Sequence, residues 1–523
     1  MISARLSPPL LRLRTPRSLV RASLPCSLAR TGSTSTATRP KQQQQKRAGD
    51  ISDAFVSLSG QNFKPLEPRY AALKKRLIRG REGAIADSWI RLLRRLRDET
   101  QEIAQLGSAA VPEVEFKDVQ DGRLSEEFRK AVEKRGVSVI RGVLPEKEAL
   151  GLKQDLRDYI RNNPHTKAFP ADNPQVYELY WSPSQMRARA HPNLLQTQRL
   201  LMEFWHSKTP DALISCSHPT AYADRIRIRQ PGDAKFALGP HVDGGSVERW
   251  EEDGYGRGKV YDAVFEGKWE EFSPWEASCR LDVVSDMYQG VGACSMLRLF
   301  QGWLSMSETG PFEGTLKVNP LLGVATSYYL LRPFFTPKRP ASEFGGSGGG
   351  QSAAFLDPAN WIMEPDPTSW VQGATPGHGQ ELAASLHPHL DLERSMVHVP
   401  RVQPGDYVAW HCDTIHAVDN VHAGTADSSV LYIPSCPLTE SNAKFLLRQR
   451  EAFVQGIPCP DFGGGEGESR HVGRPTAADV ARTADADGLR AFGLQEWDAD
   501  EPGLSPGQRE VLNRANKTLG FYT

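Results

Sequence analysis

Short runs of alternating apolar and polar residues dominate the middle of this chain and predict β-strands. Two of them, Tyr407-Val-Ala-Trp410 and Val430-Leu-Tyr-Ile-Pro434, are rich in β-branched and aromatic residues, which favour pleated strands. The turn sequence Pro404-Gly-Asp406 stands directly before the first of them. Similar patterns predict further strands within residues 136–144, 224–230, 295–306, 316–322, 326–331 and 397–400.

Helical periodicity lies mainly toward the two ends of the chain. Within residues 66–106, an apolar stripe with spacings i, i+4, i+7 and i+11 is formed by Ile85, Trp89, Leu92 and Leu96. The opposite face carries several arginines, and we interpret it as the solvated side of a helix packed on the main body. Further helices are predicted after Pro145 and within residues 439–455 and 505–518.

Many short strands flanked by helices predict a mainly β fold with helical cover. The specific expectation is a jelly-roll, that is, a double-stranded β-helix or cupin-like barrel, with flanking N- and C-terminal helices. We divide the chain into an N-terminal helical region at 48–135, a jelly-roll core at 136–438 and a C-terminal helical cover at 439–523. A flexible glycine-rich loop is expected at 340–353 within the core.

Residues 1–47 differ in composition from the rest and are typical of a mitochondrial transit peptide. They contain eight Arg and two Lys, many Ser and Thr, and no acidic residue. We therefore expect a mitochondrial protein, with a disordered tail on a cytoplasmic protein as the alternative.

Without residues 1–47 the chain is acidic. Removing their ten basic residues from the total of 63 leaves 53 basic against 63 acidic residues, a net charge near −10. An acidic mature chain does not favour nucleic acid as a partner.

Neither a membrane span nor a disulfide framework is predicted. The chain has no run of 18 or more apolar residues, which a transmembrane helix needs. Its seven cysteines are odd in number and form no Cys-x-x-Cys pair, which fits a reducing compartment. The sequence does not specify an oligomeric state.

Two histidines and one aspartate form the main candidate for a metal site: His241, Asp243 and His416. A set of two histidines and one carboxylate holds iron(II) and leaves the remaining positions open. His-x-Asp occurs three times in the chain, and we favour the pair at 241 and 243 because it follows a strand and a turn and is flanked by glycines. His389 is expected at the surface. In the pair at 411 and 413, the histidine is expected to brace the turn before His416 and the aspartate to close it.

Several segments resemble known oxygenase families. The Pro-Gly-Asp turn with His416 eleven residues after Gly405 resembles phytanoyl-CoA hydroxylase-like oxygenases, as does Glu313-Gly-Thr-Leu-Lys-Val-Asn-Pro320, with Glu313 in place of that family's Asn. The longer strings at 241–250 and 300–303 are similar to the YbiU-like family of iron(II)/2-oxoglutarate oxygenases. The similarity covers roughly residues 66–520.

The resemblance implies an iron(II)- and 2-oxoglutarate-dependent dioxygenase that uses O2 to hydroxylate a small molecule. Phytanoyl-type enzymes place an arginine for the far carboxylate of 2-oxoglutarate some ten to fifteen residues after the distal histidine, but residues 426–431 contain no arginine or lysine. A buried carboxylate needs a charged partner, preferably bidentate. Arg298 is the first candidate for this role, followed by Arg229, Arg227 and Arg280, with the Ser429 hydroxyl as a helper.

Two other classes of protein remain possible on the same residues. A non-redox zinc or manganese hydrolase or isomerase on a cupin-like barrel uses similar ligands. A barrel that has lost catalysis and only binds a ligand is the other alternative.

Overall fold

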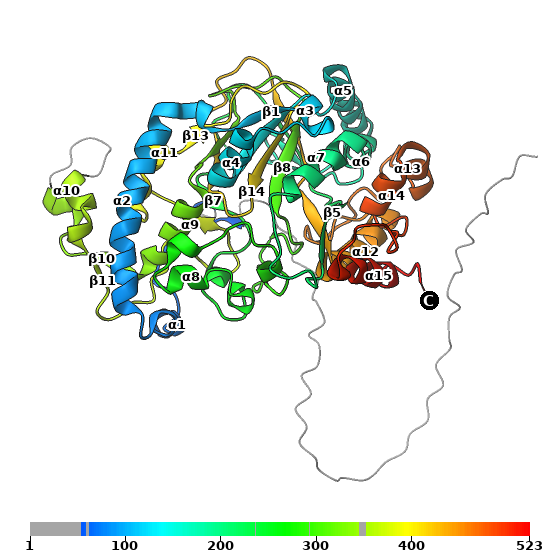
Figure 1. The fold of residues 1–523 in the computed structure, drawn as a ribbon. Coiled ribbons are helices and arrows are strands. Elements are labelled where there is room, and N and C mark those ends of the chain that lie inside the picture. The colour runs from blue at the N-terminus through cyan, green and yellow to red at the C-terminus, as the bar shows by residue number, and fades with distance from the viewer. Residues whose placement is uncertain (1–53, 59–61, 236, 292, 345–351, 523) are drawn as a thin grey trace, which may run out of the picture. The chain divides into compact units, whose positions relative to one another are not determined.

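The computed structural model describes residues 54–522 except 59–61, 236, 292 and 345–351 (Figure 1). The described residues belong to one compact unit. The expected transit peptide at 1–47 and half of the expected glycine-rich loop at 340–353 lie outside the described residues.

The larger of two main sheets has eight strands in the order β1-β2-β14-β8-β16-β6-β4-β3. All neighbours are antiparallel except β1 and β2, which run parallel. In sheet order, the strands are β1 Glu113–Glu115, β2 Val137–Arg141, β14 Tyr407–His411, β8 Phe300–Ser305, β16 Ser428–Tyr432, β6 Ile226–Arg229, β4 Val176–Tyr177 and β3 Ala168–Phe169.

The second main sheet has five antiparallel strands in the order β12-β7-β15-β9-β13. These strands are β12 Gln380–Glu381, β7 His241–Val242, β15 His416–Val418, β9 Leu316–Val318 and β13 Val397–His398. Two further pairs are β10 Phe335–Pro337 with β11 Trp361–Met363, and β5 Ile214–Thr220 with β17 Cys436–Thr439.

Both main sheets end on edge strands, so the hydrogen-bonded pairs between described residues do not close a barrel. The expectation of a β-sheet core covered by helices is confirmed. The closed barrel expected from the jelly-roll prediction is not seen, because β1 and β3 at the edges of the larger sheet pair on one side only. Sequence patterning predicts individual strands, whereas closure depends on pairing between strands far apart in the chain.

Helices surround the sheets (Figure 1). The two long helical regions predicted at the ends of the chain are confirmed, since α1 and α2 lie within 66–106, and α12 and α15 within 439–518. The helices are α1 Arg69–Ile78, α2 Glu82–Leu106, α3 Phe116–Gln120, α4 Glu126–Arg135, α5 Glu146–Asn162, α6 Pro183–Arg189, α7 Pro192–Met202, α8 Asp262–Phe265, α9 Leu322–Leu331, α10 Ala353–Leu356, α11 Leu392–Ser395, α12 Glu440–Gln455, α13 Ala477–Thr483, α14 Ala486–Ala491 and α15 Pro506–Thr518.

The predicted strand at 326–331 is wrong, because these residues form the second half of helix α9. Nine of the ten residues of α9 are buried, so the helix shows no polar face and its sequence has no 3.6-residue periodicity. A short apolar run of this kind does not distinguish a buried strand from a buried helix. The Ser327 hydroxyl donates to the Gly323 carbonyl at 2.8 Å, a hydrogen bond within the helix.

The apolar stripe of α2 is buried as predicted, and its aromatic residue anchors the helix. The Trp89 ring stacks on Phe335 with centroids 4.3 Å apart and on Tyr328 at 5.4 Å. On the opposite face, Arg91 pairs with Glu270 at 2.7 Å and Arg95 with Glu99 at 2.6 Å. The arginines of this helix thus form a solvated face with acidic partners, as interpreted from the sequence.

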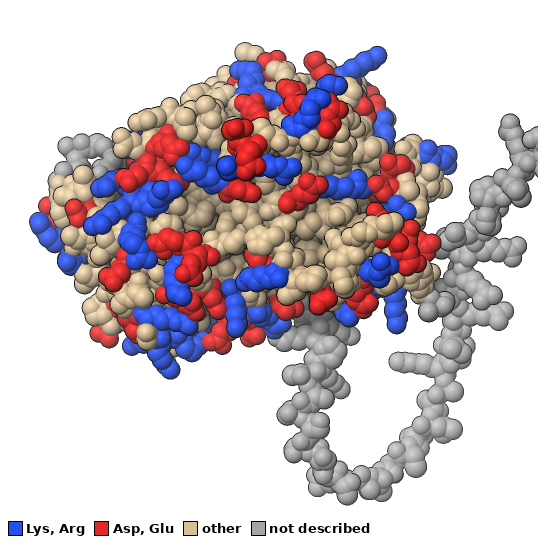
Figure 2. All heavy atoms as spheres, in the orientation of Figure 1, with Lys and Arg blue, Asp and Glu red and all other residues tan. Residues whose placement is uncertain are grey.

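Basic and acidic side chains alternate over the face of the molecule shown in Figure 2. This mixture agrees with the many ion pairs at the surface, such as Arg123 with Asp118 at 3.1 Å. Among the described residues, no helix combines the length and hydropathy that a membrane crossing requires.

Candidate metal centre and cavity

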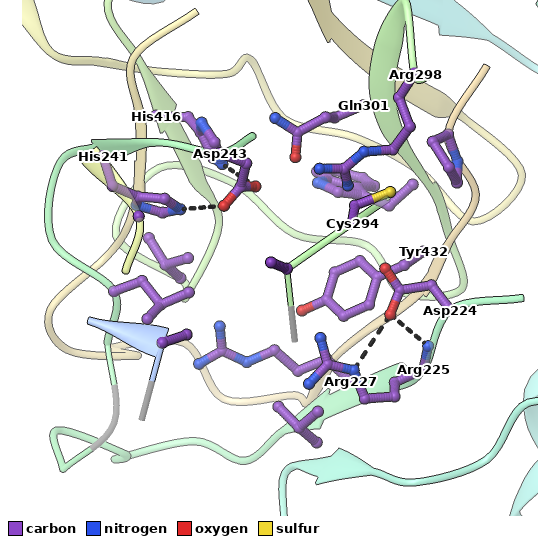
Figure 3. A pocket seen from close by; sticks show the side chains of 18 of the residues that line it. Asp224, Arg225, Arg227, His241, Asp243, Cys294, Arg298, Gln301, His416 and Tyr432 are labelled. Atoms are coloured by element: carbon purple, nitrogen blue, oxygen red, sulfur yellow. Dashed lines mark hydrogen bonds and ion pairs between the residues drawn. The ribbon is translucent and has the colours of Figure 1, made fainter. Parts of the chain in front are cut away.

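The two histidines of the predicted triad are direct cross-strand neighbours. His241 opens β7 and His416 opens β15, and the two residues pair in the register of the five-stranded sheet. Their ring centroids lie 4.1 Å apart. Asp243 directly follows β7, so two neighbouring strands bring all three side chains together (Figure 3).

The Asp243 carboxylate bridges the two imidazoles. Its Oδ1 lies 3.9 Å from His241 Nε2, and its Oδ2 lies 3.6 Å from His416 Nε2. The glycines after Asp243 permit this approach: Gly245 has φ +78°, and a Cβ there would lie 2.4 Å from the Ser285 carbonyl oxygen. Only glycine adopts this turn without a clash.

Backbone carbonyls set the protonation of both imidazoles. His241 Nδ1 lies 2.7 Å from the Gly239 carbonyl, and His416 Nδ1 lies 3.1 Å from the Thr414 carbonyl. A carbonyl only accepts, so each Nδ1 carries the proton and donates it. In the neutral form of each ring, this leaves the lone pair on Nε2, the nitrogen nearer Asp243, which is how histidines that bind metals are oriented.

Gln301 and Trp410 hold the carboxylate in place from the larger sheet. With its amide oriented to satisfy its neighbours, Gln301 donates from nitrogen to Asp243 Oδ2 at 2.6 Å and accepts from Trp410 Nε1 at 3.3 Å. Gln301 lies on β8 and Trp410 on β14, which pair directly in the sheet. The carboxylate is therefore also held by a neutral hydrogen-bond donor, the Gln301 amide.

The three side chains fit a divalent transition metal. Bonds of about 2.1 Å place neighbouring ligand atoms roughly 3.0–3.4 Å apart. The separations of 3.6 and 3.9 Å are only a few tenths of an ångström wider. All three ligand atoms lie within 4.8 Å of one another. Small side-chain rotations would bring them to one ion, and all three would approach it from one side.

Electrostatics favour the protonation states that bind metals. Burial, together with the neighbouring His416, lowers the pKa of His241 to about 4, against the opposing effect of Asp243. Burial acts to raise the pKa of Asp243, but the neighbouring His416, His241 and Arg298 outweigh it, so this pKa lies below the usual range. A neutral imidazole and an ionised carboxylate are the forms that coordinate metal ions.

The triad faces a cavity of about 220 Å³ between the two main sheets. Side chains of β8, β16 and β6 line it from the larger sheet, and the triad lines it from the smaller one. Phe55 covers the triad on one side, because its ring meets the His241 ring edge-on at 4.8 Å. Phe55 is itself buried, so the site is shielded from bulk solvent at this point.

Arg298 projects its guanidinium into the cavity beside Gln301 (Figure 3). Within the described residues, this guanidinium makes no hydrogen bond and no ion pair. It lies close enough to Asp243 for its charge to lower the pKa of that carboxylate. The structure therefore places the first-ranked arginine where an anion bound next to the triad would meet it.

The other predicted arginines have different surroundings. Arg229 lies in the cavity wall, but its Nε pairs with Asp233 at 2.8 Å and its Nη atoms donate to three carbonyls. Arg227 lies one same-face position earlier on β6 and also lines the cavity. Arg280 is not among the cavity-lining residues, and its guanidinium pairs with Asp413.

Ser429 does not meet the expectation of a helper in the cavity. Its hydroxyl donates to Asp427, and the side chain is absent from the cavity lining. The reason is the alternation of side chains along a strand. Ser428, Val430 and Tyr432 face the cavity from β16, so Ser429 faces the other way.

The other two His-x-Asp motifs have structural roles. His389, expected at the surface, is buried: its Nδ1 lies 3.1 Å from the Tyr328 hydroxyl, and its ring packs against Trp361 at 4.7 Å. His411 braces its turn as expected, with Nδ1 accepting from the Asp413 amide at 3.0 Å and Nε2 donating to the Pro274 carbonyl at 3.0 Å.

Gln301 and Phe55 are members of the site that the sequence patterns did not indicate. Gln301 is part of the string at 300–303 used for the family resemblance, and its spacing of two from Trp303 gave a signal that both face the same side of β8. No local pattern identifies Phe55, because its contact with His241 depends on a fold-back over more than 180 residues of chain.

The structure thus defines a class of protein: two main sheets enclose a shielded cavity, and a site of two histidines and one carboxylate faces it. Residues 64–494 match the Gig2-like family model, and the chain belongs to the Gig2-like family. YbiU of Escherichia coli K12 is 30% identical over 406 residues, which cover 74% of this chain and 86% of YbiU. The similarity to YbiU-like proteins is thereby confirmed.

Solved structures of relatives share the fold. The crystal structure of GlcNAc Inducible Gene 2 (GIG2) from Candida albicans is 31% identical, with a TM-score of 0.77 over 88% of this chain and 96% of that one. A protein of Salmonella typhimurium LT2, provisionally named an oxidoreductase, is 29% identical with a TM-score of 0.69, over 82% of this chain and 98% of its own.

Proposed function

We propose that this protein is an iron(II)- and 2-oxoglutarate-dependent dioxygenase that hydroxylates a small molecule. The observation that carries the proposal is the convergence of His241 Nε2, His416 Nε2 and the Asp243 carboxylate on one point at the edge of a cavity that also receives the Arg298 guanidinium. The provisional oxidoreductase name of the Salmonella relative supports the same reaction class.

Each residue of the site has a defined role in this proposal. His241, Asp243 and His416 hold iron(II) from one side and leave its remaining positions open toward the cavity. When bound, iron(II) would supply the activation of O2 that couples conversion of 2-oxoglutarate into succinate and carbon dioxide to hydroxylation of the substrate. Gln301 orients the Asp243 carboxylate, and Phe55 helps to exclude water.

Arg298 binds the far carboxylate of 2-oxoglutarate in this proposal. No described residue forms an ion pair with Arg298, and a guanidinium in a shielded cavity is costly unless a ligand brings an anion to it. The planar guanidinium suits a carboxylate, because it forms two parallel hydrogen bonds to it. Arg229 is a poorer choice, since Asp233 already neutralises it.

Two further parts of the proposal concern the fold and the subcellular location. We assign the two facing sheets to the jelly-roll arrangement of phytanoyl-CoA hydroxylase-like oxygenases, on the basis of the turn before His416 and its position at the start of β15. We also propose that residues 1–47 direct the protein to mitochondria, on the basis of their composition alone.

The proposal is tested by turnover of 2-oxoglutarate. Purified protein should form succinate slowly without added substrate, and only when both iron(II) and O2 are present. Asp243→Asn is the control, because it removes the charged ligand and should abolish succinate formation. Absence of succinate from a protein that holds one iron per chain, across a set of small-molecule substrates, would favour the hydrolase, isomerase or binding-only classes.

A further inference from the structure

The turn that carries Asp243 begins where its strand ends. Strand β7 ends at Val242, so Asp243 is the first residue beyond the strand. The next two residues are glycines in the left-handed region, Gly244 with φ +87° and Gly245 with φ +78°. Glycine leaves the backbone more conformational freedom than any other residue. The position of the Asp243 carboxylate therefore depends on contacts that the turn makes with other parts of the chain.

Two side chains from the segment after the turn hold all three of its carbonyl groups. Arg249 donates from Nη2 to the Asp243 carbonyl at 2.6 Å and from Nη1 to the Gly245 carbonyl. The Tyr255 hydroxyl donates to the carbonyl between them, that of Gly244, at 3.0 Å. The guanidinium thus spans the turn from its first residue to its third, and it contacts the backbone of the metal ligand itself.

Arg249 acts on the turn from the protein interior and not from the cavity. It is 1% exposed and does not belong to the described residues that line the cavity, whereas the Asp243 side chain is 31% exposed. Its guanidinium lies 5.4 Å from the centre of the Tyr255 ring and 6.0 Å from that of Tyr329. These rings attract the cation and limit the positions open to it. Arg249 therefore reaches the cavity only through Asp243.

The same segment also holds the turn before the distal histidine. The Tyr255 ring stacks on Tyr261 with centroids 5.3 Å apart, and the Tyr261 hydroxyl donates to Asp413 at 3.0 Å. Asp413 lies three residues before His416. Residues 249–261 thus contact the turns beside two metal ligands, one on each of the neighbouring strands β7 and β15.

We propose that Arg249 is a positioning residue for the metal centre. By holding the carbonyls of Asp243 and Gly245, it keeps the Asp243 carboxylate where both imidazoles can share one ion with it. The inference rests on the metal triad of the proposed function and adds a residue that touches neither metal nor substrate. Losing a group that orients a metal ligand typically lowers metal affinity about 10–100-fold.

A second buried arginine provides a matched comparison for a purely structural role. Arg332 is 8% exposed and donates to the carbonyls of Leu386 and Phe335 at 2.9 and 2.7 Å. Its guanidinium lies over the Trp361 ring at 4.8 Å. Arg332 thus makes the same kinds of contact as Arg249, but it holds no segment next to a metal ligand. If Arg249 acts only on folding stability, Arg249→Met and Arg332→Met should affect metal binding alike.

The test is an anaerobic titration of the purified protein with iron(II) and, separately, with cobalt(II). Iron(II) gives the dissociation constant, and the visible absorption of bound cobalt(II) reports the geometry of its ligands. Arg249→Met should bind both ions at least tenfold more weakly, and its cobalt(II) spectrum at saturation should differ from that of the wild type. Arg332→Met should unfold at a lower urea concentration but keep the wild-type affinity and spectrum.

Milder variants test the same contacts with less risk to folding. Tyr255→Phe removes only the hydrogen bond to the Gly244 carbonyl, so it should weaken iron(II) measurably but less than Arg249→Met. Arg249→Lys keeps the charge without the planar fork that spans two carbonyls, and its affinity should lie between those of Arg249→Met and the wild type. Arg97→Met changes an arginine that is 73% exposed, and it should behave like the wild type.

The outcomes separate this inference from the proposed function. A wild-type protein that binds neither iron(II) nor cobalt(II) would refute the triad and with it the proposed function. With normal binding by the wild type, unchanged affinity and spectrum in a folded Arg249→Met would overturn the inference alone. Equal losses in Arg249→Met and Arg332→Met would also overturn it, because they would show an effect of stability only. If Arg249→Met does not fold, wild-type affinity and spectrum in Tyr255→Phe would overturn it.

Discussion

Asp413 and Asp243 each lie next to a histidine, yet replacing them by asparagine should have opposite effects. Asp413 Oδ2 pairs with Arg280, and its Oδ1 accepts from the Tyr261 hydroxyl at 3.0 Å. The side chains of Asp413 and Arg280 are 1% and 3% exposed. Asp413→Asn therefore leaves a buried guanidinium without its counter-ion, whereas Asp243→Asn changes a side chain that is 31% exposed to the cavity.

The loss of folding stability expected for Asp413→Asn is large relative to the total stability of a folded protein. Removing one partner of a buried ion pair typically costs roughly 3–5 kcal/mol, against a total of about 5–15 kcal/mol.

The contribution of Asp413 to stability depends on pH with a defined sign. Burial acts to raise the pKa of Asp413, but Arg280 and His411 lower it to about 2. The folded pKa thus lies below the unfolded value of about 3.9, so the carboxylate contributes about 2–3 kcal/mol above pH 5, and this contribution is lost as the pH falls through 2.

The assay combines urea unfolding with metal analysis. Asp413→Asn should unfold at a clearly lower urea concentration at pH 7 and should lose less stability than the wild type on acidification, while the folded fraction retains iron(II). Asp243→Asn should unfold near the wild-type midpoint and lose the iron. An Asp413→Asn protein of normal stability that no longer binds iron would refute this reasoning and move the metal to the neighbouring cluster of His411, Cys412 and Asp413.

Three further predictions concern the metal ligands, the cosubstrate and the subcellular location. His416→Ala should abolish tight iron binding in a folded protein, whereas His411→Ala should cost stability and retain the metal, and the reverse metal contents would show the triad to be misassigned. Arg298→Ala should weaken 2-oxoglutarate at least a hundredfold, the equivalent of roughly 3–5 kcal/mol for a buried charged pair, with iron binding near normal; an unchanged affinity in a binding titration would point to β6. Residues 1–50 fused to a fluorescent reporter should carry it to mitochondria in cells, and a diffuse cytosolic signal would contradict the predicted transit peptide.

Local chemistry predicted much of what positions the site. The turn at 404–406 and the period-two pattern after it gave β14. The turn predicted before His416 is also present, and β15 begins at that histidine. Alternation along 224–230 correctly predicted strand β6, on which Arg227 and Arg229 face the cavity together with Arg225 just before it. These successes depend on interactions between residues close in sequence, for which side-chain period and turn residues are sufficient.

The errors arose where tertiary contacts decide the outcome. The second half of α9 has the composition of a strand, but the helix is buried on all sides and so shows no periodicity. His389 follows a proline-containing stretch typical of the surface, yet it packs against Trp361 and Trp89. Ser429 was one residue out of phase with the cavity face of β16, and a shift of one residue reverses the direction of a strand side chain.

The most direct test of the account is the visible spectrum of the protein with iron(II) and 2-oxoglutarate without oxygen. Iron(II) held by two histidines and one carboxylate has positions open for a bidentate 2-oxo acid. The complex with 2-oxoglutarate should give a weak charge-transfer band. We expect this band for the wild type, its loss in His416→Ala, and a much higher 2-oxoglutarate requirement in Arg298→Ala. An iron-loaded wild-type protein that shows no band at saturating 2-oxoglutarate would contradict the central claim.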